Sequence, residues 1–114
     1  WGAMVQKSIE ACNQLEYSVE VIDIRFLFPL DFDLIRNSVK KTNKLLIVHE
    51  DNINNGFGAE IASRVADSCF ESLDAPIKRV ASKDFPVPYS SKLEDEILVQ
   101  TEWIVSAINE LIEY

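Results

Sequence analysis

The residues best suited to chemistry stand together in the stretch IVHEDNINNGFGAEIASRV, residues 47 to 65. His49 is the only histidine of the chain, Glu50 and Asp51 follow it directly, and a glycine-containing turn comes next. An imidazole beside carboxylates can serve acid–base catalysis or metal binding, and glycines ahead of a helix can bring backbone N–H groups to an anion. The stretch therefore raises a catalytic, a metal-binding and an anion-binding hypothesis.

The spacing of these residues weakens the first two hypotheses. Consecutive residues of a strand point to opposite faces, so His49, Glu50 and Asp51 do not converge easily on one metal ion. Nucleophilic catalysis needs a serine or cysteine held beside a base, but the chain has no G-x-S-x-G stretch and neither cysteine falls in a predicted loop. A small hydrolase built on these three residues stays open as an alternative, because any acidic loop gives the same pattern.

The turn from Asn55 to Gly58 leaves a second alternative open. Its NGFG stretch lacks the GxGxxG spacing of a dinucleotide site and the GK[ST] of a phosphate-binding loop. The simpler interpretation is structural: Asn55-Gly56 supplies a positive φ, and Gly58 lets the next helix pack closely on the sheet. The alternative is a stand-alone module that binds small anions through this turn.

The elements that must position this stretch alternate along the chain. Apolar residues at helical spacing predict helices near 3–15, 31–41, 58–73 and 101–113. Runs of β-branched and apolar residues predict strands near 19–25, 44–49 and 77–81. Asp31 is a natural cap for the second helix and Thr101 for the last, whereas the proline-punctuated residues 83–97 predict an extended, irregular segment.

This alternation predicts an α/β fold. We expect one domain over residues 1–114, a three-layer α/β/α sandwich with a mainly parallel sheet between the helices. The residues expected in its core are Val21, Ile22, Ile24, Leu46, Ile47, Val48, Ile61, Val65 and Ile108. Ligand sites of such folds lie beyond the carboxyl ends of the strands, which is where His49 to Gly58 falls.

Charge and cysteine content narrow the class of partner. The net charge of −8 disfavours a nucleic-acid or anionic membrane surface and suits a basic protein partner. No apolar stretch is long enough to span a membrane. Cys12 and Cys69 fall on helical apolar faces without CxxC spacing, which is typical of small core residues in a reduced, cytoplasmic protein.

The order of several short stretches resembles a known family. The run from VIDIR through PLD, VHED, GFGAEI and DAPIKRV to PVPYS is similar to the C-terminal domain of thiamine-diphosphate-dependent 2-oxo acid dehydrogenases. The resemblance is to the β subunit, or the β-like half of a fused chain, of pyruvate, branched-chain 2-oxo acid and acetoin dehydrogenases, and more distantly to transketolase. The stretches VHEDNINNGFGAEIAS and CFESLDAPIKRVAS look nearest to branched-chain or fused forms.

The resemblance implies a role in assembly rather than in chemistry. Thiamine diphosphate and magnesium are bound by other parts of the parent enzyme, so no catalytic, cofactor-binding or metal-binding residue is expected in this domain. The isolated domain is expected to be inactive. The domain instead contacts other domains and subunits, and His49, Glu50 and Phe57 become candidate interface residues at a strand end.

The same resemblance implies a docking surface for the lipoyl-acyltransferase core, whose subunit-binding domain is small and basic. Carboxylates beside an aromatic anchor suit such a partner, because charge speeds encounter and the ring offers buried area. The candidate residues lie near the C-terminal end: Glu94, Asp95, Glu96, Glu110, Glu113 and Tyr114 with its α-carboxylate.

One departure from the family concerns the sheet. The family usually has a central strand just before the position of Trp1, and here only its last residue is present. The sequence is therefore expected to be a fragment of a longer chain, or another chain completes the sheet. A slot should remain between the 19–25 and 44–49 segments, and because unpaired strand edges recruit other chains, we expect self-association into a homo-oligomer.

Overall fold

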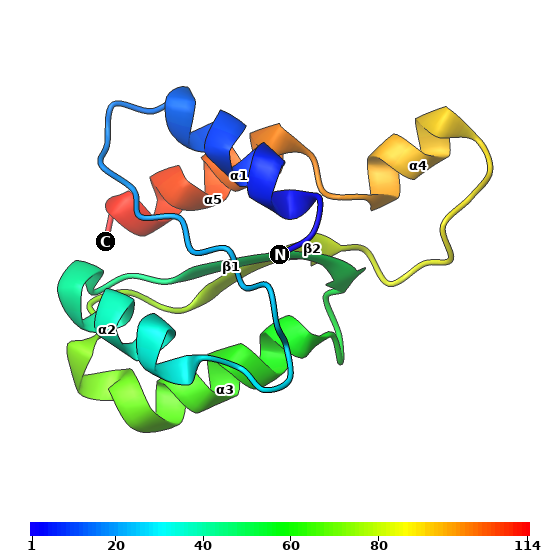
Figure 1. Ribbon diagram of the computed structural model, residues 1–114. Coiled ribbons are helices and arrows are strands. Elements are labelled where there is room, and N and C mark those ends of the chain that lie inside the picture. Colours follow the sequence, from blue (N-terminus) through cyan, green and yellow to red (C-terminus); the bar gives the residue numbers. More distant parts are fainter.

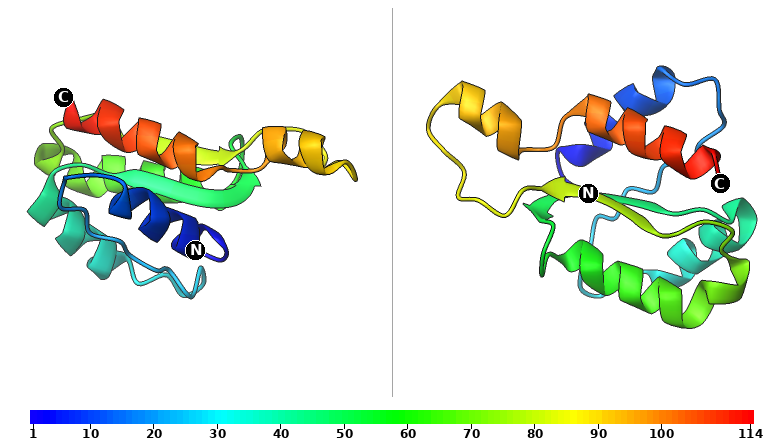
Figure 2. Two further views of the ribbon diagram at one scale, coloured as in Figure 1. Left: turned by 90° about the horizontal axis from the view of Figure 1, so that it is seen from above. Right: turned by 180° about the vertical axis from the view of Figure 1, so that it is seen from behind.

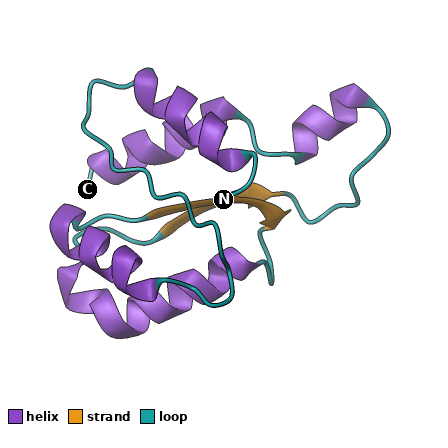
Figure 3. Cartoon of the chain, in the orientation of Figure 1, coloured by secondary structure: helices purple, strands orange, loops and turns teal.

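The computed structural model describes residues 1–114 (Figure 3). In chain order the elements are α1 (Met4–Asn13), α2 (Phe32–Thr42), β1 (Leu46–Asn52), α3 (Phe57–Cys69), the 3-10 helix η1 (Phe70–Ser72), β2 (Lys78–Ser82), α4 (Ser91–Ile97) and α5 (Thr101–Ile112). The predicted helices at both ends and in the middle, and two of the three predicted strands, are present within a few residues of their expected bounds.

The helices cover both faces of a small parallel sheet. β1 and β2 pair in parallel, with Val48 opposite Val80 in the register. α1 and α5 lie together on one face, and α2 and α3 lie on the other (Figures 1 and 2). The predicted α/β class with its parallel sheet is confirmed: the sheet lies between a layer made by α1 and α5 and a layer made by α2 and α3.

Strand β1 separates two apolar clusters because its side chains alternate between the faces. Ile47 packs in a buried cluster with α2 and α3, made by Ile35, Val39, Ile47, Ile61, Val65 and Cys69. Leu46 and Val48 point the other way and pack against a second cluster, made by Met4, Ala11, Val99, Ile104 and Ile108. Its members come from α1, from α5 and from the short link between α4 and α5. β1 therefore touches both halves of the core.

Local signals explain where α2 begins and ends. The Asp31 carboxylate accepts a hydrogen bond from the Leu34 backbone N–H at 3.2 Å, which is the predicted cap. At the other end Asn43 adopts φ 62°, and its N–H bonds the Val39 carbonyl. The cap expected at Thr101 is wrong: Gln100 occupies the cap position of α5, without a side-chain hydrogen bond, and Thr101 is already the first helical residue.

The strand predicted at 19–25 does not form. These residues run extended past β1, but no backbone–backbone hydrogen bond involves residues 18–25. The β-branched side chains favour an extended backbone, yet a strand also needs a neighbouring backbone to pair with. Glu20 ties the segment to α2 through an ion pair with Lys41 at 2.6 Å.

The predicted burial is wrong for several residues in and beside this segment, which the structure leaves partly exposed. Ile47, Ile61, Val65 and Ile108 are buried as expected. Val21 is instead 39% exposed, and Ile22, Ile24, Leu46 and Val48 are only partly buried. These five residues border the space between the extended segment and β1, so they lack a neighbour that would cover them.

Residues 83–97 are more regular than predicted. Their second half forms α4, a short helix that buries none of its residues. In Figures 1 and 2 this helix projects away from the layered body. No helix of the chain has both the length and the apolar character needed to cross a membrane.

Ile47 offers a test of the central position of β1. It is 5% exposed and packs against α2 and α3, so Ile47→Ala should lower the free energy of unfolding by roughly 2–5 kcal/mol in chemical denaturation. Leu34→Ala, at an exposed position of α2, serves as the control and should change it by less than about 1 kcal/mol. A loss below about 1 kcal/mol for Ile47→Ala would show that β1 is not central.

Candidate functional site

His49 lies deep in the structure, on the face of β1 that also carries Ile47. Its side chain is 0% exposed. The Trp1 ring stacks on the imidazole, with centroids 5.1 Å apart and planes 2° apart, and Phe57 meets the edge of Trp1 at 6.1 Å. Neither Nδ1 nor Nε2 of His49 has a hydrogen-bond partner. The imidazole is thus packed as an aromatic core group.

The glycines of the turn make room for this ring. A Cβ on Gly58 would lie 2.3 Å from Nε2 of His49, and a Cβ on Gly56 would lie 2.8 Å from its Cε1 and 2.3 Å from the Asn52 carbonyl oxygen. Asn55 supplies the positive φ of the turn, at 60°. The structural interpretation of the NGFG stretch therefore accounts for both glycines.

The neighbouring carboxylates do not join His49 in a site. Glu50 and Asp51 are exposed, whereas His49 is enclosed, and the Asp51 carboxylate accepts a hydrogen bond from the Asn52 backbone N–H at 2.8 Å. No three His, Cys, Asp or Glu side chains gather in a geometry that could hold a metal ion. A hydrolase needs a base that reaches its substrate, and the buried imidazole reaches none.

The anion-binding alternative meets unfavourable electrostatics. The hollow at the start of α3 is lined by Asp51, Asn55 and Glu60 together with Gly56, Phe57 and Ala59. Two carboxylates at this position repel an anion, although the helix N-terminus itself would attract one. The geometry therefore does not favour phosphate binding at the turn.

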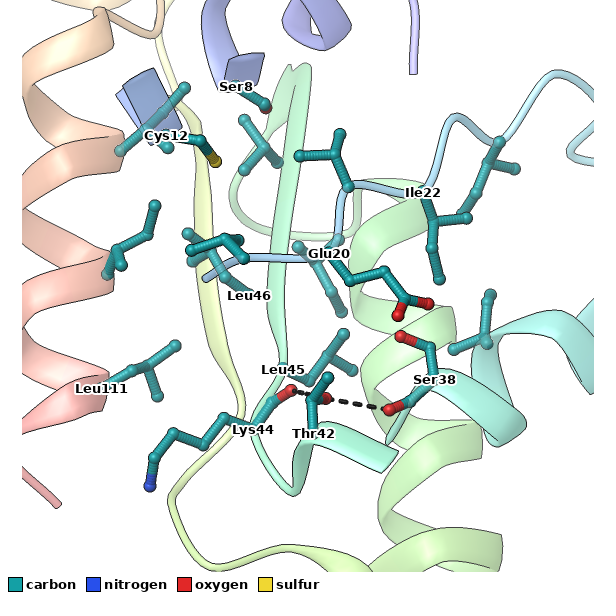
Figure 4. A pocket seen from close by; sticks show the side chains of 18 of the residues that line it. Ser8, Cys12, Glu20, Ile22, Ser38, Thr42, Lys44, Leu45, Leu46 and Leu111 are labelled. Atoms are coloured by element: carbon teal, nitrogen blue, oxygen red, sulfur yellow. Dashed lines mark hydrogen bonds between the residues drawn. The ribbon is translucent and has the colours of Figure 1, made fainter. Parts of the chain in front are cut away.

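A second hollow is an apolar slot, which we define as the cavity between the 18–24 segment and β1. It has a volume of about 260 Å³ and a mainly hydrophobic lining. Ile22 and Leu46 are among the side chains that gather around it in Figure 4. Helices on both faces complete the walls, with Val5 and Ile108 on one side and Ile35 and Ile61 on the other.

The backbone around the slot is unpaired on both sides. β1 is bonded to β2 along one edge only, because the sheet has two strands, and residues 18–25 make no backbone–backbone hydrogen bond. Two extended backbones with an apolar gap between them, covered by helices above and below, match the site that one further strand would occupy. The open slot expected from the sequence is present.

The expected acidic cluster does not exist as one surface. Glu94, Asp95 and Glu96 lie on α4, while Glu110, Glu113 and Tyr114 lie at the far end of α5, and the two ends are on opposite sides of the molecule (Figures 1 and 2). Glu110 is also engaged by Lys78 at 2.5 Å. At the C-terminal end, Glu113 and Tyr114 remain exposed without an ion pair.

Sequence patterns missed the contribution of Trp1. Its ring stacks on His49, lines the slot and packs against the buried cluster that contains Ile47. Trp1 stands three residues before the start of α1 and belongs to no periodic pattern, so nothing in the sequence indicated this contact.

Comparison with known proteins places these features in a family context. Residues 1–104 match the family described as "Transketolase, C-terminal domain". The chain is 45% identical over 110 residues to "Pyruvate dehydrogenase E1 component subunit beta, mitochondrial" of Dictyostelium discoideum, covering 94% of this chain and 31% of that protein. It is 44% identical over 114 residues to "Acetoin:2,6-dichlorophenolindophenol oxidoreductase subunit beta" of Bacillus subtilis (strain 168), covering 97% of this chain and 33% of that protein. The chain thus spans about a third of the length of these relatives.

The contact between Gly58 and His49 predicts a coupled pair of substitutions. Gly58→Ala should lower the free energy of unfolding by about 1–3 kcal/mol, because the new methyl group meets the imidazole. In a His49→Ala background the same change should cost at least about 1 kcal/mol less, because only the 3.2 Å contact with Ile47 Cγ2 remains and alanine is the better helix former. Urea denaturation of the four proteins measures the coupling.

Gly56→Ala is the matched control for this cycle. Its Cβ would meet the Asn52 backbone carbonyl oxygen, which truncation of His49 does not move, so its cost should persist in both backgrounds. An equal cost of Gly58→Ala with and without the imidazole would contradict the packing described for His49.

Burial also predicts a pH dependence. It lowers the pKa of the His49 imidazole below its ordinary value, against the opposing effect of Asp51 and with a smaller contribution from Arg79. On lowering the pH, His49 of the unfolded chain takes up a proton at about pH 6.5, while the buried imidazole of the folded chain stays neutral. The contribution of the neutral imidazole to the free energy of unfolding is therefore fully present well above this pH and decreases as the pH is lowered. Denaturation of the wild type and of His49→Gln between about pH 7.5 and 5 should show the decline only in the wild type. Parallel profiles would refute it.

Proposed function

Because the chain belongs to the transketolase C-terminal domain family, we propose that it is the C-terminal assembly domain of the β subunit, or β-like half, of a thiamine-diphosphate-dependent 2-oxo acid dehydrogenase. In this role it forms contacts with other domains and subunits and helps to dock the lipoyl-acyltransferase core. The parent enzyme carries out oxidative decarboxylation of a 2-oxo acid and transfers the acyl group to that core. The domain acts in assembly and not in this chemistry.

The observation that carries the proposal is the apolar slot. An enzyme acting on a polar substrate would need polar groups in its site. The cavity between residues 18–24 and β1 instead has a mainly hydrophobic lining and lies at an unpaired strand edge. Such an edge is suited to pairing with another polypeptide segment. The relatives are named as β subunits, and a protein with a β subunit contains further subunits.

The residues present do not fit thiamine diphosphate or magnesium. The diphosphate would need cationic or N–H donors, but Asp51 and Glu60 line the turn, and no group of carboxylates is arranged for a metal. We therefore assign both cofactors to other parts of the parent enzyme. Calorimetry of the 114-residue chain with thiamine diphosphate should give no binding heat, and saturable binding would favour the small-anion alternative.

For the parent enzyme we propose a 2-oxo acid as the substrate, without naming which one, and the cytoplasm as the compartment. The relatives are named for pyruvate and acetoin, while the 48–63 stretch resembles branched-chain or fused forms, so the proposal names 2-oxo acids as a group. Cys12 and Cys69 are unpaired thiols, which suits the reducing environment of the cytoplasm.

For docking, the proposal concentrates on the end of α5. Glu113 and Tyr114 are exposed there, and Glu113 has no ion-pair partner. Glu110 is a weaker candidate, because the Lys78 ammonium already holds its carboxylate. A small basic domain would gain charge complementarity from Glu113 and buried area from the Tyr114 ring.

Deletion of Glu113 and Tyr114 from the full dehydrogenase tests this docking end. Titration with the cognate subunit-binding domain should show a salt-sensitive loss of affinity of about tenfold or more, while turnover of free 2-oxo acid is retained. Phe28→Ala with Glu60→Gln removes an exposed aromatic ring and an acid elsewhere and should leave affinity unchanged. Unchanged affinity after the deletion at low salt would place the docking site elsewhere.

The open slot predicts self-association of the 114-residue chain. Light scattering across a concentration series should show dimers or larger species, because β1 and the 18–24 segment present unpaired backbone. Val21→Lys places a charge at the slot and should shift the chain toward monomer, whereas Phe28→Lys in an exposed loop should not. A monodisperse wild-type monomer would refute this part of the proposal.

A further inference from the structure

Residues 83–97, which we call the arm, project from the layered body of the domain (Figure 1). The first and last residues of the arm lie next to each other, and we call this pair of ends its base. The Lys83 backbone N–H donates to the Ile97 carbonyl at 3.0 Å, so the two ends of the arm are bonded to each other. Asp84 accepts hydrogen bonds from the backbone and side chain of Asn54, and the Lys83 ammonium lies 5.4 Å from the Trp103 ring centroid. The base is fixed to the turn after β1 and to α5.

Beyond the base, the arm presents large apolar side chains to solvent. Phe85, Val87 and Leu93 are each more than half exposed, and Tyr89 is fully exposed. α4 has no buried residue, and only Ile97 of its two large apolar residues is partly covered. Several exposed apolar side chains on one projecting segment are typical of a protein–protein contact, and tyrosine is among the residues that most often dominate such contacts.

The backbone of the arm suits recognition through side chains. Pro86 and Pro88 restrict φ and lack an N–H group, which makes this segment a poor partner for strand addition. Because its two ends are already bonded together, the arm loses less conformational entropy on binding than an open loop would.

Charge selects the kind of partner. Glu94, Asp95 and Glu96 follow Leu93 directly, and none of the ion pairs of the chain includes a residue of the arm. The complete chain carries a net charge of −8, so a second copy would be repelled at this acidic surface. A basic surface would be attracted.

We propose that the arm inserts Phe85, Tyr89 and Leu93 into an apolar groove on the companion subunit of the parent enzyme, with Lys or Arg side chains at the groove rim facing residues 94–96. This contact rests on the proposed function and goes beyond it, because it assigns a second interface at the end of the molecule opposite Glu113 and Tyr114.

The test uses the full-length β chain, alone and with its cognate companion subunit. Tyr89→Ser combined with Leu93→Ser should weaken assembly by about tenfold or more in analytical ultracentrifugation. The melting temperature of the β chain alone should not change, because neither side chain is buried. Phe70→Ser, at an exposed aromatic residue of η1 outside the arm, is the matched control and should assemble like the wild type.

Two further measurements test the contact: the salt dependence of association and the hydrogen exchange of the arm amides. Replacing Glu94, Asp95 and Glu96 by their amides should slow association and reduce its dependence on salt. Hydrogen exchange of the arm amides should slow in the wild-type complex relative to the free β chain.

The outcomes separate this inference from the proposed function. If the wild-type subunits assemble but the arm variants assemble equally tightly and the arm amides stay unprotected, the arm contact is wrong and the proposed function stands. If the wild-type chain does not associate with the companion subunit at all, the proposed function and the arm contact both fail.

Discussion

The fold depends on the position of β1 between two apolar clusters. Ile47 points toward α2 and α3, while Leu46 and Val48 point toward α1 and α5. Because side chains alternate along a strand, this single segment must satisfy both sides at once. A shift of one residue in register would exchange the two sets and would move His49 out of the space left by Gly58.

Features set by neighbouring residues could be predicted from the sequence. The Asp31 cap, the positive φ of Asn55 and the apolar stripe of α3 each depend on a few adjacent positions, and each is present. The β1 strand was recognisable because the run of four apolar residues from Leu45 to Val48, three of which lie in β1, is typical of a strand covered on both faces. The structural interpretation of the Asn55–Gly58 turn, made from its residue types, agrees with the packing of the imidazole against the two glycines.

Features that depend on distant or missing neighbours could not be predicted in this way. Residues 19–25 have strong β propensity, but propensity alone does not supply a backbone to pair with. The proposed acidic cluster failed for a geometric reason: α5, with 12 residues, is about 18 Å long, so residues before and after it are separated in space. The stacking of Trp1 on His49 joins positions 48 residues apart and leaves no local pattern.

The division of the core by β1 also affects how the sequence can vary over evolution. The cluster that contains Ile47 and the cluster that contains Met4 share no buried member. Substitutions in separate clusters have nearly additive effects on stability, so each side of the sheet can accumulate compensating changes with little regard to the other. Epistasis between the two sides should therefore be concentrated at β1, where one backbone carries residues of both.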